Sequence, residues 1–418
     1  MPAGSGPASH QVRAQFRPAT AETWPNPWPM YRALRDHDPV HHVVPQDGTG
    51  RNSPDYYVLS RHADVWSAAC DTETFSSTLA AAVNYSELKD TGRQHNRPPA
   101  LQGSPEHAAF RKLVSHGLAP RLAALESRVR EFVAERIERL RADGGGDIVA
   151  ELFRPLPSMV VADYLGVPEA DRAHFDGWAE AISAVTAAEG GLSHAVKNVA
   201  GSLATMTAYF TELIKLRRLV PGDDTVSQLV GMGLGADGDA AGMQSVLAFV
   251  FAMIANGIDT TTGMLGGSVQ LLHQRPDQRN LLIENPGLIP GSVDEFLRLT
   301  SPVQAMSRTT TRDVAIGDSI IPEGHQVLLL YGSANRDERQ YGSDAGELDV
   351  QRQPRNILSF SQGVNRCLGA AAARMQSRVA LTELLSRCPD FEIEESGIVW
   401  AGSSHVRRAL SVPFRVDS

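Results

Sequence analysis

The longest helical candidate in the sequence, residues 240–272, limits what this chain can fold into. At a rise of 1.5 Å per residue, a helix of this length spans roughly 50 Å, the full width of a domain. Residues 255–263 at its middle, Ala-Asn-Gly-Ile-Asp-Thr-Thr-Thr-Gly, contain several poor helix formers. Threonine hydroxyls also bond back to the carbonyl one turn earlier, so we expect a local distortion of the helix there.

Helical periodicity dominates most of the remaining chain. Apolar residues recur at three- and four-residue steps from Leu122 to Leu140, which predicts an amphipathic helix with a charged outer face. Further helices are predicted over residues 150–165, 171–187, 195–218, 276–284, 291–299 and 368–386. Strands are predicted at Val40–Val44, Tyr56–Leu59, Val314–Ile316 and Val327–Leu330. The predicted fold class is therefore mainly α with a smaller β-rich portion.

One domain is expected after a short N-terminal segment. Residues 1–20 are rich in Gly, Pro, Ala and Ser and are predicted to be disordered. No internal repeat and no Gly/Ser linker divides residues 21–418, so we expect a single domain there. We find neither a signal peptide nor an uninterrupted apolar stretch long enough to span a bilayer, and therefore expect no membrane association.

The charge and the cysteines narrow the classes of partner and compartment. The chain has 39 basic and 48 acidic residues, and this net charge of −9 argues against nucleic acid as the main partner. Its three cysteines, Cys70, Cys367 and Cys388, are too few for a disulfide framework and are not spaced like a zinc site. A reducing, cytoplasmic location is predicted.

Cys367 lies in a turn-rich loop, residues 360–369, that leads straight into the last predicted helix. The start of a helix favours a thiolate, because its unpaired N–H groups and partial positive charge lower the pKa of a thiol. Gly363 and Gly369 allow backbone amides to approach the sulfur and leave room for a flat macrocycle. Taken alone, a single cysteine is more often a small buried hydrophobic residue.

This loop resembles the signature of the cytochrome P450 family, Phe-Gly-x-Gly-x-His/Arg-x-Cys-x-Gly. The positions that match are Phe360, Gly363, Cys367 and Gly369. The resemblance implies a haem b whose iron is bound by the Cys367 thiolate. Two positions depart from the signature: Ser361 stands where Gly is usual, and Asn365 stands where His or Arg usually contacts a haem propionate.

The resemblance extends from about residue 25 to the C-terminus. It implies the family's triangular helical body, with the long central helix lying over the haem. Within the family, Leu299–Val350 and Asn356–Phe391 are most similar to the mycobacterial group numbered 130.

A charged trio is expected to support the thiolate loop. Glu295 and Arg298 are three residues apart and share one face of a predicted helix, where they can form a charge-assisted hydrogen bond. Taken alone, such a pair is usually a solvated surface ion pair. In the P450 family a Glu-x-x-Arg pair binds a later arginine, and the segment around Arg352 resembles the one that supplies it.

The middle of the long helix resembles the family's oxygen-binding motif. The resemblance implies that Thr260 hydrogen-bonds dioxygen or an ordered water and that Asp259 relays protons inward. Gly257 belongs to the same motif, and Asn256 places a polar group where the family has a small residue. The alternative is that these small residues only allow close helix packing.

Cations are expected beside the haem propionates, because two buried carboxylates need compensating charge. His107 and Arg111 match the family's His-x-x-x-Arg and share one helical face. Arg308 matches the family's third propionate contact. Taken alone, each of these side chains is usually just solvated.

The implied function is insertion of one oxygen atom from O2 into a small, largely apolar organic molecule, by hydroxylation or dealkylation. The chain has no flavin or iron–sulfur domain of its own, so ferredoxin and ferredoxin reductase are the expected electron donors. We place the ferredoxin near Arg111, Lys112 and Arg366, whose cations would steer an acidic partner. Azole inhibitors are expected to coordinate the iron.

Three alternatives remain open from the sequence. An H2O2-driven peroxygenase would use the same ligand but tends to lack an acid–alcohol pair such as Asp259 and Thr260. A non-catalytic haem-thiolate ligand sensor would have no use for these two residues. A purely structural helical protein is the third alternative.

Overall fold

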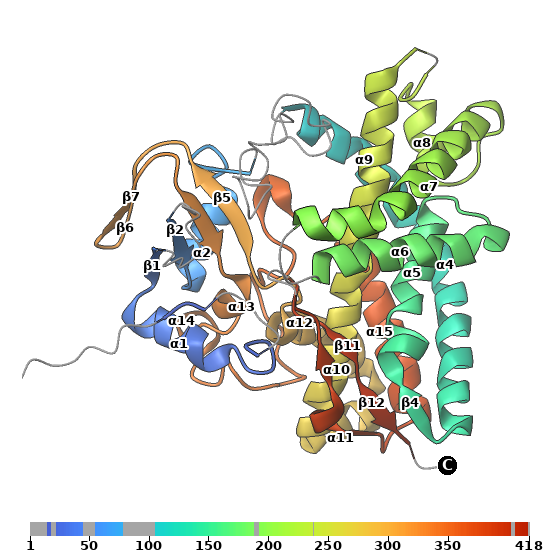
Figure 1. Ribbon diagram of the computed structural model, residues 1–418. Coiled ribbons are helices and arrows are strands. Elements are labelled where there is room, and N and C mark those ends of the chain that lie inside the picture. Colours follow the sequence, from blue (N-terminus) through green and yellow to red (C-terminus); the bar gives the residue numbers. More distant parts are fainter. Residues whose placement is uncertain are drawn as a thin grey trace, which may run out of the picture.

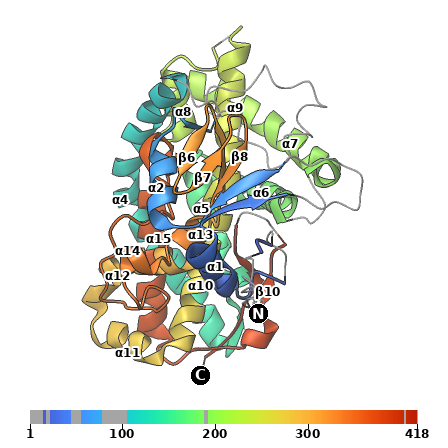
Figure 2. The same cartoon turned by 90° about the vertical axis from the view of Figure 1, so that its left-hand side faces the viewer.

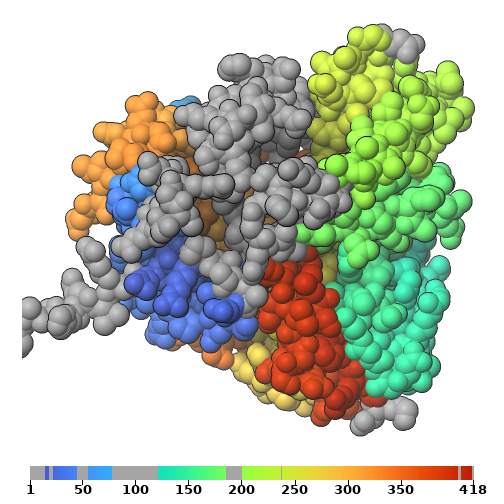
Figure 3. Space-filling view, in the orientation of Figure 1, coloured from blue at the N-terminus to red at the C-terminus, as the bar shows by residue number. Residues whose placement is uncertain are grey.

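The computed structural model describes residues 15–17, 22–44, 55–77, 105–187, 192–236, 238–402 and 406–416, without the side chains of 105–120, 185–187 and 192–199. A β-rich portion and a larger helical portion lie side by side (Figure 1). In the space-filling view the β-rich portion is blue and orange and lies opposite the green and teal helical portion (Figure 3). The predicted fold class is confirmed.

Helices form most of the described chain. In chain order they are α1 (Trp28–His37), α2 (His62–Cys70), α4 (Pro105–Ala142), α5 (Pro155–Tyr164), α6 (Arg172–Ala187), α7 (Leu192–Leu219), α8 (Thr225–Gly231), α9 (Ala240–Gly257), α10 (Asp259–Gln274), α11 (Pro276–Glu284), α12 (Ile289–Thr300), α13 (Tyr331–Ala334), α14 (Glu338–Tyr341) and α15 (Ala370–Arg387). A π-helical turn, Val149–Phe153, precedes α5.

The strands of the described residues are short and form four small sheets. They are β1 (Val40–Val43), β2 (Tyr56–Leu59), β3 (Phe75–Ser76), β4 (Gly145–Asp147), β5 (Met306–Thr310), β6 (Val314–Ile316), β7 (Ser319–Ile321), β8 (Gln326–Leu329), β9 (Glu392–Ile393), β10 (Val399–Trp400), β11 (Ala409–Ser411) and β12 (Pro413–Arg415). The largest sheet has the order β1-β2-β8-β5-β3, and its β2–β8 pair is parallel while the others are antiparallel. The smaller sheets are β4-β12-β9, β6-β7 and β10-β11.

The main core lies where α4, α10, α12 and α15 pack together. The views in Figures 1 and 2 agree that α4 and α15 lie along each other. The apolar positions of α4 that the periodicity predicts to face inward, Val129, Val133 and Ile137 among them, are fully buried in this core. Burial of one apolar stripe stabilises each of these amphipathic helices far more than their intrinsic propensity does.

The long central helix is interrupted at Ile258, between α9 and α10. Ile258 has φ −91° and ψ −61°, and no regular helix is assigned there. The threonines that follow Ile258 bond back along the chain, since the hydroxyl of Thr260 donates to the carbonyl of Asn256 at 2.7 Å and that of Thr262 to the carbonyl of Ile258 at 3.0 Å. The distortion predicted from this cluster of glycine and threonine is confirmed.

Asn256 and Asp259 interrupt the apolar sequence of this central helix, so the expectation about an uninterrupted apolar stretch is not contradicted. Ala240–Gln274, which covers α9 and α10, is nevertheless long and apolar enough to cross a membrane by length and composition. One such helix is a weak indication of a membrane, because the core helix of a soluble protein passes the same test. Most of α10 is buried against other parts of the chain.

Candidate active site

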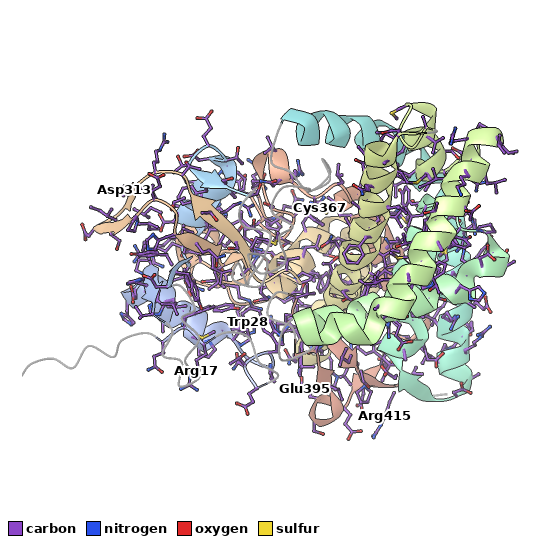
Figure 4. All side chains as sticks on the ribbon, turned by 45° about the horizontal axis from the view of Figure 1, so that its top comes forward. Arg17, Trp28, Asp313, Cys367, Glu395 and Arg415 are labelled. Atoms are coloured by element: carbon purple, nitrogen blue, oxygen red, sulfur yellow. The ribbon has the colours of Figure 1, made fainter. Side chains whose placement is uncertain are left out.

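Cys367 is accessible at the start of α15. It is solvent-exposed, and Figure 4 shows it between the β-rich portion and the helix formed by α9 and α10. Its backbone N–H donates to the carbonyl of Phe360 at 2.8 Å, which closes the loop. Cys388 is the opposite case, because burial raises the pKa of its thiol to about 11. Cys367 therefore differs from a cysteine that is merely a small buried hydrophobic residue.

The glycines of the thiolate loop have different local roles. Gly363 has φ +65°, a left-handed conformation that favours glycine, and it lies against the backbone of Cys70 at the end of α2. Gly369 caps the N-terminus of α15, and a Cβ there would lie 3.8 Å from the sulfur of Cys367. Phe360 is buried, with the guanidinium of Arg374 4.6 Å from its ring centre.

Two buried donor atoms, one in β5 and one in the thiolate loop, have no partner among the described residues. Arg308 in β5 is 2% exposed and forms no ion pair with a described side chain. Its Nη1 donates to the carbonyl of Ser307 at 2.7 Å, while its Nε has no acceptor. The Nδ2 of Asn365 is also buried without an acceptor. Buried donors, one of them a cation, call for an anionic acceptor, so this pair fits the carboxylates of a bound ligand.

Glu295, Arg298 and Arg352 come together as the motif predicts. Glu295 and Arg298 are both fully buried, and two N–H···O contacts of 2.7 Å join them. The Nε of Arg352 donates to the same carboxylate at 3.2 Å. The alternative of a solvated surface ion pair is therefore wrong. Arg298 also donates to the carbonyls of Asn335 and Ala345, so the trio fastens α12 to the segment that precedes the thiolate loop.

The polar residues of α9 and α10 differ in exposure. Asn256 is exposed and Thr260 is half-buried, one helical turn further along. The Nδ2 of Asn256 donates to the carbonyl of Ala252 at 2.8 Å. Because the hydroxyl hydrogen of Thr260 is used on the carbonyl of Asn256, its oxygen is left to accept a hydrogen bond from a water or a ligand.

Asp259 is held by two residues that sequence reasoning missed. The hydroxyl of Ser183 on α6 donates to its Oδ1 at 2.7 Å, and the Nε of Arg408 lies 3.2 Å from its Oδ2. Arg408 also donates to the hydroxyl of Ser183 at 2.8 Å, and all three side chains are buried. Burial lowers the pKa of Arg408, and the neighbouring carboxylate opposes that shift. Asp259 thus joins α6, α10 and the segment before β11.

The glycines of the central helix serve close packing. A Cβ at Gly257 would lie 2.8 Å from a methyl group of Val161 on α5, and one at Gly263 would lie 2.8 Å from the carbonyl oxygen of Arg407. Gly257 thus allows the close packing that the alternative expects, and its place in the oxygen-binding motif stays a prediction. His107 and Arg111 lie on α4, but their side chains are outside the part of the molecule that the structure describes.

A groove of about 240 Å³ adjoins the thiolate loop. It is lined by Trp66, Asp294, Pro354, Asn356, Ile357, Phe360, Gln362, Arg366 and Arg374. Arg374 is paired with Asp294 at 2.7 Å, and Arg366 is exposed. Two arginines beside one aspartate give this groove a cationic excess.

Comparisons with known proteins agree with this geometry. Residues 281–397 match the family model for cytochrome P450. The chain is 65% identical over 405 residues to cytochrome P450 130 of Mycobacterium tuberculosis, covering 97% of this chain and 98% of that protein. It is 32% identical over 394 residues to the vitamin D(3) 25-hydroxylase of Pseudonocardia autotrophica, covering 93% of this chain and 94% of that enzyme.

Comparison with solved structures shows that the similarity to cytochromes P450 includes the fold. Cytochrome P450 CYP109Q5 from Chondromyces apiculatus superimposes with a TM-score of 0.80 at 29% identity, covering 94% of this chain and 96% of that one. The match over almost the whole length, together with the loop around Cys367, assigns the chain to a family. This chain belongs to the cytochrome P450 family of haem-thiolate monooxygenases and is similar to its mycobacterial group 130.

Proposed function

We propose that the protein uses haem b to insert one oxygen atom from O2 into a small, largely apolar organic molecule. The observation that carries this proposal is an accessible Cys367 just before α15, together with the buried Nε of Arg308 and Nδ2 of Asn365, which have no acceptor among the described residues. Bound haem supplies the redox chemistry that splits O2 and transfers one of its atoms. Cys367 is the iron ligand, while Arg308 and Asn365 hold the propionates. We assign His107 and Arg111 to the same carboxylates.

Proton delivery is assigned to Asp259 and Thr260. Hydroxylation consumes two electrons and two protons, because the second oxygen atom leaves as water. Asp259 takes a proton on the side where Arg408 and Ser183 hold it, and the oxygen of Thr260 accepts a hydrogen bond from a water that carries the proton onward. Asn256 lies one turn from Thr260 and adds a polar contact for the substrate or that water.

Replacement of Thr260 by alanine tests the proposal. With NADH, ferredoxin and ferredoxin reductase, T260A should consume oxygen while forming less product and more H2O2, because the hydroxyl that guides the proton is gone. A peroxygenase driven by H2O2 would change little, and a ligand sensor would form no product even as the wild type. Product yield per NADH, measured for both proteins, decides among the three.

Ferredoxin is proposed to dock over the groove that contains Arg366 and Arg374. The cations there attract an acidic partner, and docking over this groove brings the partner close to Cys367, so that the path for electron transfer is short. R366E should slow electron transfer and weaken its dependence on salt. R415E is the matched control, since Arg415 is an exposed arginine that Figure 4 shows well apart from Cys367. Equal rates and equal salt dependence in wild type and R366E would count against this docking surface.

The substrate class is proposed to be small and largely apolar. The relative from Pseudonocardia autotrophica is named for hydroxylating vitamin D3, which is such a molecule. A spectral binding screen over diverse small molecules would find the ligand, and azoles should give the spectrum of nitrogen bound to iron. We propose a single catalytic domain over residues 21–418, a cytoplasmic location, and no nucleic acid or membrane partner.

A further inference from the structure

Ser361 in the thiolate loop has a backbone conformation that an L-amino acid rarely adopts. Its φ is +56°, in the left-handed region, where the Cβ of a non-glycine residue crowds the neighbouring carbonyl oxygen. Serine stands here where the signature has glycine, which adopts the same conformation at no steric cost. Such a residue persists only where its surroundings hold it in place.

Tyr331 supplies that support. Its hydroxyl lies 2.9 Å from the Oγ of Ser361, and this is its one hydrogen-bond partner among the described residues. Tyr331 is 1% exposed, so without Ser361 its hydroxyl would be buried with no partner in that set. A glycine at position 361 offers no such oxygen. The serine and the tyrosine therefore form a pair. The hydrogen bond holds Ser361 in its unfavourable backbone conformation and gives the buried hydroxyl of Tyr331 a partner.

The pair acts on the turn that carries the ligand cysteine. The N–H of Ser361 donates to the carbonyl of Leu358 at 2.9 Å, which fixes the direction of the peptide between Phe360 and Ser361. The carbonyl of that peptide is the one that accepts the N–H of Cys367 at 2.8 Å. A change in the backbone at Ser361 therefore moves the acceptor that closes the loop around the sulfur.

The segment that bears Tyr331 is also connected to the strand pair that contains Arg308. α13 follows directly after β8, and β8 pairs with β5, where Arg308 lies opposite Val327. One short stretch of chain thus connects the strand pair that contains the buried Arg308 to the turn that precedes Cys367. Asn335, the residue that follows α13, adds a second contact with the loop by donating to the hydroxyl of Ser359 at 2.9 Å.

We propose that Tyr331 is a positioning residue for the iron-binding loop, acting through the hydroxyl of Ser361. The pair replaces the glycine of the signature and sets where Cys367 stands relative to Arg308. The spectroscopic readout rests on the proposed role of Cys367 as iron ligand. Coupling between Tyr331 and Ser361 in protein unfolding does not depend on that role, so the two can fail separately.

A double-mutant cycle over wild type, Y331F, S361G and Y331F/S361G tests the pair. The measurements are the rate at which the ferrous carbon monoxide complex loses its red-shifted Soret band at raised temperature, and the melting temperature of the protein. Y331F alone should speed the loss of the band about fivefold, the usual effect of one lost hydrogen bond. In the S361G background, Y331F should not speed the loss of the band and should leave the melting temperature unchanged or raise it, because the glycine needs no support and the change removes a buried hydroxyl that has lost its partner.

The order of two single variants gives a second test if Y331F does not fold. S361A keeps a Cβ in the left-handed region and loses the hydroxyl, so it should lose the band faster and melt lower than S361G. Y209F is the control, since the hydroxyl of Tyr209 on α7 donates to Asp171 at 2.7 Å. It should lower the melting temperature without changing the rate of band loss. Equal effects of Y331F in both backgrounds, or S361A as stable as S361G, would overturn the proposal.

Discussion

The surroundings of single side chains decide which roles they can have. Cys367 is accessible beside a helix start, whereas Cys388 lies in the core with its pKa raised by burial. Asp259 is buried, and a charge in such a place is stable only when it is paired. Its partner Arg408 therefore sets both the stability of this region and the environment of the proposed proton donor.

Removing that partner should destabilise the protein. R408Q leaves the carboxylate of Asp259 buried without its cation, and we expect the free energy of unfolding in urea to fall by about 3–5 kcal/mol. In D259N/R408Q part of this loss should be recovered, because a neutral amide needs no cation. A fall for R408Q within about 0.5 kcal/mol of wild type, the range of ordinary surface changes, would contradict the buried pair.

The three cysteines should differ in reactivity. At pH 8 an alkylating reagent should modify the exposed Cys70 in the folded, haem-loaded protein. Cys388 should react only after unfolding, since it is buried and its pKa of about 11 leaves little thiolate. Cys367 should be protected while haem is bound and react once it is removed. Mass spectrometry of the digested protein measures each site, and labelling of Cys388 in the folded state would contradict the packing.

At the scale of elements, the central helix depends on glycines that let its neighbours approach. A Cβ at Gly263 in α10 would lie 2.8 Å from a backbone oxygen of the segment before β11, which cannot move away as a flexible side chain can. Gly266 in the same helix has nothing within 4 Å of such a Cβ. Substitutions at these two positions therefore distinguish the effect of close packing on stability from the effect of helix propensity.

Alanine at the two glycines should therefore have opposite effects. G263A should lower the free energy of unfolding by about 1–3 kcal/mol through overpacking. G266A should raise it by about 0.5–1 kcal/mol, because alanine is the better helix former. Urea unfolding of both variants measures the difference. Stabilisation by G263A would show that the segment before β11 does not lie against α10 as described.

Periodicity predicted the helices well, and the strands β1, β2, β6 and β8 were also predicted to within one residue at each end, whereas α13 and β5 were not predicted. α11 has the predicted bounds, and α12 and α15 differ by one or two residues at their ends, because their apolar stripes repeat over several turns. α13 is only four residues long, and β5 has the sequence Met-Ser-Arg-Thr-Thr, which lacks the apolar run of the predicted strands. Their pairing partners lie elsewhere in the chain, and tertiary contacts rather than local preference fix them.

At the scale of the whole molecule, the site joins segments that are far apart in the sequence. The motif residues Glu295, Arg298 and Arg352 could be predicted because their types and spacing form a pattern. Arg408 and Ser183 could not, since 225 residues separate them and neither belongs to a local motif. Tyr331 was missed for the same reason, although the serine in place of glycine at position 361 was a visible departure that called for a partner.

The bond from the sulfur of Cys367 to the haem iron is the central claim, and one spectrum tests it. The purified protein, reduced and exposed to carbon monoxide, should show the red-shifted Soret band of thiolate ligation. C367A should lose the pigment or show a Soret band at the ordinary position, while C70A keeps the red-shifted band. If the wild type lacks that band, or C367A retains it, Cys367 is not the ligand.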